Sequence, residues 1–459
     1  MGFFSKLIVG LLIVELAYLC GFFSPVLPSL DPGEGWWGKN NKTTSTKGDV
    51  TIRPFRISFD EKKLQDLKGR LRETRFFESF EDTNWSYGAR ADQMKSIRDY
   101  WLNKYSWEKQ EKLFNQFHHF ETKIEGISIH FVHVKPKVNV TQRVKPILMV
   151  HGWPGSFYEF YKIIPMLTDP TQYGGKDSDY FEVICPSLPG YGFSEAPHRP
   201  DFDPRDAARI FHILMHERLG FKDYYVQGGD WGAAVVGFMA LFYPNNVRGH
   251  HSNFITYQPP LFPLRALLGS VWPSLVLSKK SDQDKMFPFG DYMKNLVLEE
   301  AGYFHLQATK PDTVGHSLTD SPVGLAAYVL EKFSFWTNPK YPHRSDGGIT
   351  ERFSIDDLLN NVMVYWISGS ITSSMRMYKE FVDNVGVGNP YDQCPVVTPT
   401  GVAVFPYEAV RIPEPWLHYR YKNLVSYTDM TDGGHFAAME QPRLLADDIR
   451  QFVRKVENM

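Results

Sequence analysis

From about residue 146 onward, the chain alternates between two patterns of hydrophobic and polar positions. Short apolar runs stopped by glycine or proline predict buried strands, and longer runs with apolar residues at helical spacing predict amphipathic helices. The predicted strands cover residues 147–150, 181–185, 224–227, 401–405 and 423–427, and the predicted helices cover residues 203–219 and 233–242. Strands that alternate with helices of this length indicate an α/β fold with a parallel sheet covered on both faces.

The alternation lapses over residues 259–396, where the pattern is helical, rich in aromatic residues and interrupted by proline and glycine. Because strand-like runs return afterwards, we expect a helical lid inserted between two parts of one core, residues 146–258 and 397–459. Residues 29–145 precede the first clear core strand. Their aromatic residues indicate a packed helical lead-in segment rather than a linker.

Residues 1–28 have a different character. The stretch Leu7–Phe23 is apolar except for Glu15, and it is roughly the minimum length for a membrane-spanning helix. A cleaved signal peptide would also have a basic start and an apolar middle, but this run is long for one and no clear small-x-small cleavage pattern follows it. The sequence therefore predicts an N-terminal membrane anchor, with membrane lipid as its partner.

Composition narrows the possible classes of function. Apolar residues make up 43% of the chain and charged residues 22%, which is typical of a globular protein with a core. A net charge of −2 leaves no basic surface for nucleic acid. Cys20, Cys185 and Cys394 are too few for a disulfide framework and indicate packed thiols rather than a metal site. We expect no metal, no organic cofactor and no nucleic-acid partner.

The strongest signal for chemistry lies between the predicted strand 224–227 and the predicted helix 233–242. Residues 228–232, Gly-Gly-Asp-Trp-Gly, have the pattern of a nucleophile elbow with Asp230 as the nucleophile. The flanking glycines suit a tight strand-to-helix turn in which a Cβ would collide, and the helix N-terminus would stabilise the Asp230 anion. Because aspartate is also a common N-cap, the prediction depends on this context and on residues further along the chain.

An aspartate nucleophile predicts a particular reaction. The aspartate side chain is ordinarily ionised at neutral pH, so it needs no base for its own attack. It can displace a leaving group at an sp³ carbon and leave an alkyl ester on the enzyme. A base is then needed for the water that attacks the ester carbonyl. This chemistry suits epoxides and haloalkanes better than amides.

Chain order supplies the partners of Asp230. In α/β-hydrolases the nucleophile is followed by an acid and then by a histidine. Glu408 follows the strand 401–405, and His435 follows the strand 423–427 in a glycine-rich loop. His435 could activate water, while Glu408 could accept a hydrogen bond from the imidazole and hold its tautomer. Asp432 is the rival acid near His435, and Glu408 could instead be a solvated loop carboxylate.

The tetrahedral intermediate on the ester carbonyl needs hydrogen-bond donors. Residues 151–155, His-Gly-Trp-Pro-Gly, directly follow the strand 147–150 and could offer the backbone N–H of Trp153. The backbone N–H of Trp231, the residue after the nucleophile, would be the second donor of this oxyanion hole. A purely structural loop is the alternative interpretation of residues 151–155.

These motifs resemble those of the epoxide hydrolases with an α/β-hydrolase fold. The resemblance covers essentially the whole chain and is carried by residues 151–155, by Gly-Tyr-Gly-Phe-Ser at 190–194, by the elbow and by Gly-Gly-His-Phe at 433–436. Other features resemble the microsomal branch of this family, which includes insect juvenile hormone epoxide hydrolases. They are the anchor, Trp-Trp-Gly at 36–38, Ile-Arg-Pro-Phe at 52–55 and glutamate at 408.

The resemblance implies further residues and a function. In that family two lid tyrosines hold the epoxide oxygen, and Tyr303 and Tyr378 lie in matching motifs. Phenolic O–H groups can donate to the alkoxide that forms opposite Asp230. The resemblance thus implies hydrolysis of lipophilic epoxides, such as juvenile hormone or xenobiotics, to vicinal diols with water as the second substrate. It also implies an endoplasmic reticulum membrane enzyme whose catalytic domain faces the cytosol.

Two other functions are compatible with part of the pattern. A haloalkane dehalogenase shares the fold, the aspartate nucleophile and the tryptophan after it, but it needs halide-binding N–H groups instead of Tyr303 and Tyr378. A catalytically silent binder of lipophilic ligands would be favoured by loss of Asp230, Glu408 or His435, and all three are present.

Overall fold

A nine-stranded sheet forms the centre of the described part of the computed structural model, which covers residues 27–40, 49–137, 144–386 and 389–459. The strand order is β1-β2-β3-β5-β4-β6-β7-β8-β9. The strands are β1 Arg53–Phe55, β2 His119–Ile124, β3 Ile127–Val134, β4 Lys145–Val150, β5 Phe181–Pro186, β6 Tyr224–Gly228, β7 Val247–Ser252, β8 Thr400–Val404 and β9 Leu424–Asp429.

The half of the sheet from β5 to β9 is parallel, as the sequence predicts. All five predicted strands are present, as β4, β5, β6, β8 and β9. Strand β7 was not predicted, because its sequence Val-Arg-Gly-His-His-Ser has no apolar run, although His250 and His251 are buried in it. The helix α7 (Trp231–Phe242) packs on β4, β6 and β7, and α19 (Pro442–Glu457) packs on β7, β8 and β9.

The lead-in segment, residues 29–145, is not only helical, and the prediction is wrong in this respect. It contains the helices α2 (Glu61–Arg72), α3 (Ala91–Asn103) and α4 (Trp107–Phe114), but β1, β2 and β3 extend the sheet in antiparallel fashion. Glu125 and Gly126 have φ values of 48° and 88° at the β2–β3 turn. A tight two-residue hairpin turn requires positive φ at both of its positions. Because aromatic residues are frequent around this hairpin, the pattern of its strands was not recognised in the sequence.

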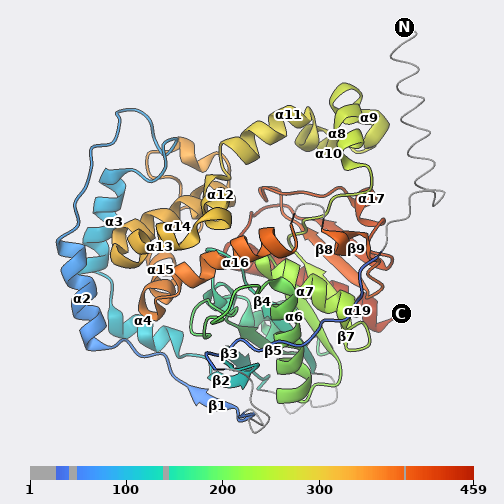
Figure 1. Cartoon of the computed structure of the whole chain (residues 1–459), viewed down its shortest axis with the longest axis horizontal. Coiled ribbons are helices and arrows are strands. Elements are labelled where there is room, and N and C mark those ends of the chain that lie inside the picture. The colour runs from blue at the N-terminus through green and yellow to red at the C-terminus, as the bar shows by residue number, and fades with distance from the viewer. Residues whose placement is uncertain (1–26, 41–48, 138–143, 387–388) are drawn as a thin grey trace.

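Between β7 and β8 the described chain is helical, as its pattern predicts, and in the view of Figure 1 these helices lie above the sheet and to its left. We call this stretch the insertion. Its helices α8–α11 share a small apolar core, separate from the main one, with Trp416 of α17 (Glu414–Leu417). The insertion comprises α8 Phe262–Val271, α9 Pro273–Val276, α10 Lys280–Met286, α11 Phe289–Tyr292, η4 Met293–Leu298, α12 Gly302–Thr309, α13 Pro311–Asp320, α14 Pro322–Thr337, η5 Tyr341–His343, α15 Ile355–Ser368, α16 Ile371–Asn384 and η6 Pro390–Gln393.

The predicted membrane anchor, Leu7–Phe23, lies outside the described residues, as does Cys20. Within the described ranges, no helix combines the length and the apolar character needed to span a bilayer. Cys185 and Cys394 are buried free thiols, as predicted.

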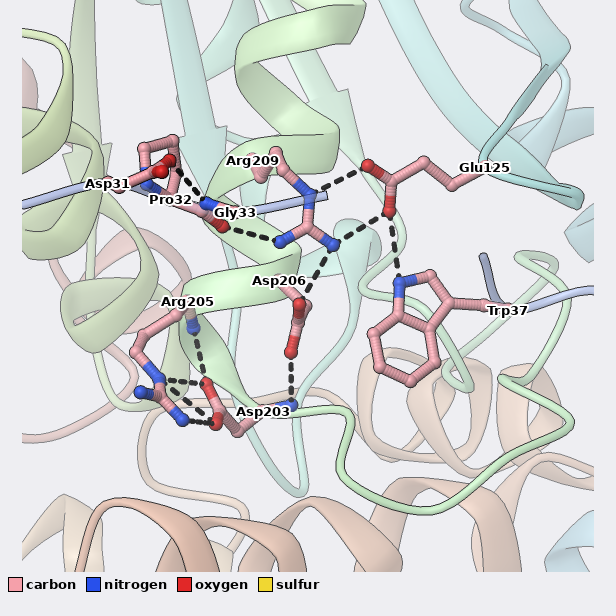
Figure 2. Close-up of polar contacts among 9 residues, drawn as sticks. All are labelled: Asp31, Pro32, Gly33, Trp37, Glu125, Asp203, Arg205, Asp206 and Arg209. Atoms are coloured by element: carbon pink, nitrogen blue, oxygen red, sulfur yellow. Dashed lines mark hydrogen bonds and ion pairs between the residues drawn. The ribbon is translucent and has the colours of Figure 1, made fainter. Parts of the chain in front are cut away.

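Arg209 of α6 (Pro204–Ile213) holds the segment that follows the predicted anchor, residues 27–40, against the body of the protein (Figure 2). The Arg209 guanidinium donates to both carboxylate oxygens of Glu125, over 2.6 and 2.8 Å, and to the carbonyl of Pro32 over 2.8 Å. The Trp37 indole donates to the same Glu125 carboxylate over 3.0 Å. One buried arginine therefore joins α6, the β2–β3 hairpin and the chain that leaves the predicted anchor.

Replacing Arg209 with alanine should release this segment. Removing one partner of a buried ion pair leaves the other charge buried alone, so the free energy of unfolding should fall by about 3–5 kcal/mol. Limited proteolysis should then cut residues 27–40 faster. Arg205→Ala is the matched control, because Arg205 pairs with Asp203 at the start of the same helix and does not contact the segment. Arg205→Ala should also lower the free energy of unfolding, because the Asp203 side chain stays buried without its partner, but it should not speed the cutting of residues 27–40. Equally fast cutting of this segment in both variants would contradict the role of Arg209.

Candidate active site

Asp230 lies at the junction of β6 and α7 in a strained backbone conformation, with φ 50° and ψ −128°. A non-glycine residue with positive φ is uncommon and persists only where its surroundings enforce it. Here close packing of the elbow enforces it: a Cβ on Gly232 would lie 1.9 Å from the carbonyl oxygen of Val150. Gly232 of the elbow motif is thus required by the approach of α7 to the end of β4.

The loop after β4 meets the Asp230 carboxylate directly. The backbone N–H of Trp153 donates to Asp230 Oδ1 over 2.7 Å. A Cβ on Gly152 would lie 2.1 Å from the same oxygen, so only glycine leaves room for this contact. Trp231 is the first residue of α7, and its indole packs edge-on against Tyr378 with ring centroids 4.7 Å apart.

Two loops bring the predicted acid and histidine together. His435 Nδ1 lies 3.0 and 2.9 Å from the two carboxylate oxygens of Glu408, and the backbone N–H of Tyr407 donates to the carbonyl of Gly433 over 3.1 Å. Asp432, the alternative acid, pairs instead with Arg352 at 2.5 Å. Glu408 is therefore the acid that contacts the imidazole.

The His435 ring lies between two carboxylates. Its Nε2 is 3.5 Å from Asp230 Oδ2, on the side opposite Glu408. Burial opposes a charge on the imidazole, but Glu408 and Asp230 outweigh it and hold the pKa of His435 well above its ordinary value. The imidazole is therefore held protonated in the resting site, between the carboxyl groups of Glu408 and Asp230.

Tyr303 of α12 and Tyr378 of α16 face each other near Asp230. Their ring centroids are 5.8 Å apart, and Tyr303 stacks on Trp153 with centroids 5.3 Å apart and an interplanar angle of 3°. The buried Tyr378 hydroxyl has no hydrogen-bond partner within the described part of the chain. Burial, reinforced by the charge of Asp230, raises the pKa of both phenols well above the ordinary value. Both phenols therefore remain proton donors.

These side chains border one apolar pocket of about 250 Å³ between α7 and the insertion. Asp230, Tyr303, Tyr378, Glu408 and His435 all line it. Most of its remaining wall is apolar and includes Phe254, Leu296, Val297, Phe304, Trp336 and Phe381. Such a pocket can enclose a lipophilic molecule and expose one carbon of it to the Asp230 carboxylate.

Sequence reasoning missed two carboxyl groups of the site, Glu159 and Glu440. Burial raises the pKa of each to about 8. Glu440 accepts hydrogen bonds from the backbone N–H groups of Gly434 and Phe436, each over 2.8 Å, and so holds the loop that carries His435. Glu159 belongs to a Ser-x-x-Glu pattern that begins at Ser156, which in sequence indicates only a helix cap. The sequence feature that could have placed Glu159 in the site is its position four residues after Gly155.

No set of three or more histidine, cysteine, aspartate or glutamate side chains within the described ranges is arranged to bind a metal ion. The chemistry of the site can be followed with its own carboxylates, imidazole, phenols and backbone N–H groups.

Comparison with known proteins adds to this geometry. Residues 52–160 match the family model described as epoxide hydrolase N terminus, and residues 145–283 match the model of the alpha/beta hydrolase fold. The chain is 46% identical over 430 residues to epoxide hydrolase 1 of Oryctolagus cuniculus, which covers 94% of each chain. It is 44% identical to juvenile hormone epoxide hydrolase 2 of Ctenocephalides felis, over 92% of this chain and 89% of that one.

A solved structure is also similar. The crystal structure of juvenile hormone epoxide hydrolase from the silkworm Bombyx mori superposes with a TM-score of 0.87 at 40% sequence identity. The match covers 94% of this chain and 99% of the silkworm chain.

Proposed function

Because the chain belongs to the epoxide hydrolases of the α/β-hydrolase fold and is itself an epoxide hydrolase, we propose that it converts lipophilic epoxides to vicinal diols through an ester on Asp230. The observation that carries this proposal is the environment of the Asp230 carboxylate. One of its oxygens accepts from the Trp153 N–H, and the other faces His435 at the wall of an apolar pocket.

In the first step, Asp230 Oδ2 attacks one carbon of the epoxide while Oδ1 stays on the Trp153 N–H. The new bond joins Oδ2 to carbon, and the bond between that carbon and the epoxide oxygen breaks. The oxygen leaves with the electron pair and takes a proton from Tyr303 or Tyr378, whose O–H groups stabilise the developing charge. Their raised pKa keeps them protonated for this role.

Ester formation then prepares the base. It removes the negative charge of Asp230, one of the two anions that raise the pKa of His435. The imidazolium can then give its proton to the phenolate left by the first step, and neutral His435 can take a proton from the water that attacks the ester carbonyl carbon. Glu408 stabilises the imidazolium formed in this way.

The tetrahedral intermediate carries its charge on Oδ1. The backbone N–H groups of Trp153 and Trp231 form the proposed oxyanion hole for this oxygen. Collapse breaks the bond to the alkyl oxygen, which takes the proton from His435 and leaves as the diol. The second proton of water, left on the Asp230 carboxyl group, passes to His435, so the cycle closes with the Asp230 carboxylate, the imidazolium and the phenols restored.

The substrate class follows from the pocket. Its volume of about 250 Å³ and its aromatic and aliphatic wall favour an extended hydrocarbon over a polar metabolite. Terpenoid epoxides such as juvenile hormone and apolar xenobiotic epoxides both meet this requirement. Relatives named for juvenile hormone are 44% and 40% identical to this chain, which supports the terpenoid class.

We further propose that Leu7–Phe23 anchors the enzyme in the endoplasmic reticulum membrane with its catalytic domain in the cytosol. Glycosylation sequons begin at Asn41, Asn84 and Asn139. In the cytosol none of them should carry a glycan, and treatment of the cell-derived protein with an endoglycosidase should leave its mobility unchanged. A mobility shift that disappears in Asn84→Gln would indicate a luminal domain instead.

The ester intermediate can be tested by the fate of an oxygen atom. In a single turnover in ¹⁸O-labelled water, the oxygen that the enzyme adds to the diol should come from Asp230. The diol should therefore be unlabelled, and the peptide that contains Asp230 should gain the label. Direct attack of water on the epoxide would give labelled diol and unlabelled enzyme.

His435→Gln should trap the same intermediate. Without the base, ester formation continues and ester hydrolysis stops, so the protein mass should rise by the mass of one substrate molecule. Asp230→Asn is the matched control and should gain no mass. Absence of an adduct in His435→Gln, with the variant folded and binding substrate, would count against Asp230 as the nucleophile.

Tyr303→Phe and Tyr378→Phe should each slow ester formation. Loss of one donor to a developing oxyanion typically costs about 10²–10³-fold in rate, whereas hydrolysis of the ester should be unaffected. Tyr328→Phe is the control, because its ring also packs on Trp153 but its hydroxyl lies 3.3 Å from Gln307. Normal ester formation with slow ester hydrolysis in the Tyr303 and Tyr378 variants would refute the assignment.

A further inference from the structure

A second and much smaller cavity borders Asp230 and His435. Its volume is about 20 Å³, enough for a single water molecule, which needs about 10–15 Å³. Besides these two residues, its polar lining consists of the side chains of Glu159 and Asn253, and Gly152 and Gly229 supply backbone. A water in this space would have several polar partners, as a buried water requires.

Glu159 reaches this cavity from the short helix η1 (Phe157–Tyr161), which follows the loop that carries Trp153. A Cβ on Gly155 would lie 1.4 Å from Glu159 Oε1, so the carboxyl group fills the space that a side chain at position 155 would occupy. Within the described part of the chain, the backbone N–H of Ser156 donates a hydrogen bond to it. No lysine or arginine of the described chain forms an ion pair with it.

Asn253 supplies the other polar contact. It follows β7, and its side-chain oxygen accepts a hydrogen bond of 2.7 Å from the amide of Gln227. This contact fixes the orientation of the Asn253 amide. The Asn253 nitrogen therefore faces Gly229, where it can donate a hydrogen bond into the cavity.

We propose that this cavity holds the water that hydrolyses the Asp230 ester, and that Glu159 and Asn253 orient it. Asn253 donates to one lone pair, and Glu159 accepts one O–H. The other O–H then points to His435 Nε2, and the free lone pair points to the carbonyl carbon of Asp230. This inference rests on the proposed two-step function and adds a residue to its second step.

Glu159 can accept this hydrogen bond without being ionised. Burial raises its pKa to about 8, and the nearby charges of Asp230 and Glu440 add to the effect while His435 opposes it. In the resting enzyme Glu159 is therefore largely protonated. The carbonyl oxygen of the neutral carboxyl group can accept the water O–H.

The test separates the two steps in single-turnover experiments on the full-length enzyme. Glu159→Gln should form the ester at a rate within about twofold of the wild-type rate. It should hydrolyse the ester about 10–100-fold more slowly, the loss expected from a misplaced reactant. Glu159→Leu, which leaves no polar group at this position, should be slower still in the same step.

Ser156→Ala is the matched control for damage to the helix. Ser156 Oγ accepts from the Tyr158 N–H at 3.3 Å and donates to Asn361 over 2.8 Å, so its loss disturbs η1 and leaves the Glu159 carboxyl in place. Both steps should stay near their wild-type rates. If the Glu159 variants fail to fold, Asn253→Ser tests the same water from the opposite wall and should slow ester hydrolysis alone.

Three outcomes would overturn the role of Glu159. These are ester hydrolysis at the wild-type rate in Glu159→Gln, equal slowing of both steps, and a comparable loss in Ser156→Ala. Each of them leaves the ester itself in place, so the proposed function would stand. Failure of the wild-type enzyme and His435→Gln to form any ester would instead refute the proposed function.

Discussion

The positive φ of Asp230 is the constraint on which the rest of the site depends. It points the Asp230 carboxylate away from the backbone of β6 and α7 and places it between the Trp153 N–H and His435. A residue in this conformation is held only by its surroundings, and here those surroundings are glycine backbones in close contact. The end of β4, the elbow and the start of α7 therefore depend on one another, and a Cβ at Gly152 or Gly232 would separate them.

Charge imposes the second constraint. Four carboxyl groups, those of Asp230, Glu408, Glu159 and Glu440, act on one imidazole, His435. Burial holds Glu159 and Glu440 largely protonated, whereas Glu408 and Asp230 hold the imidazole charged. A reaction that neutralises Asp230 shifts this balance. The same event that forms an ester would therefore free His435 to act as a base.

The substrate pocket depends on contacts between segments that are far apart in the sequence. Tyr303 and Tyr378 come from α12 and α16 of the insertion, whereas Trp153 comes from the loop after β4. The stacking of Tyr303 on Trp153 and the packing of Tyr378 against Trp231 join the insertion to the elbow. This aromatic contact sets the distance between the phenol donors and the carboxylate, and with it the space available to an epoxide.

The sequence by itself determined five of the six parallel strands that the structure describes, the elbow around Asp230 and the order of Glu408 and His435, because a local pattern of residues encodes each of these. It missed β7, whose buried residues include two histidines, and the β2–β3 hairpin, and it assigned Tyr303 and Tyr378 only by resemblance. Only the tertiary structure decided that Glu408 rather than Asp432 contacts His435 and that Glu159 reaches the cavity beside Asp230. These contacts depend on how loops pack against one another. The periodicity of hydrophobic residues along the chain does not determine that packing.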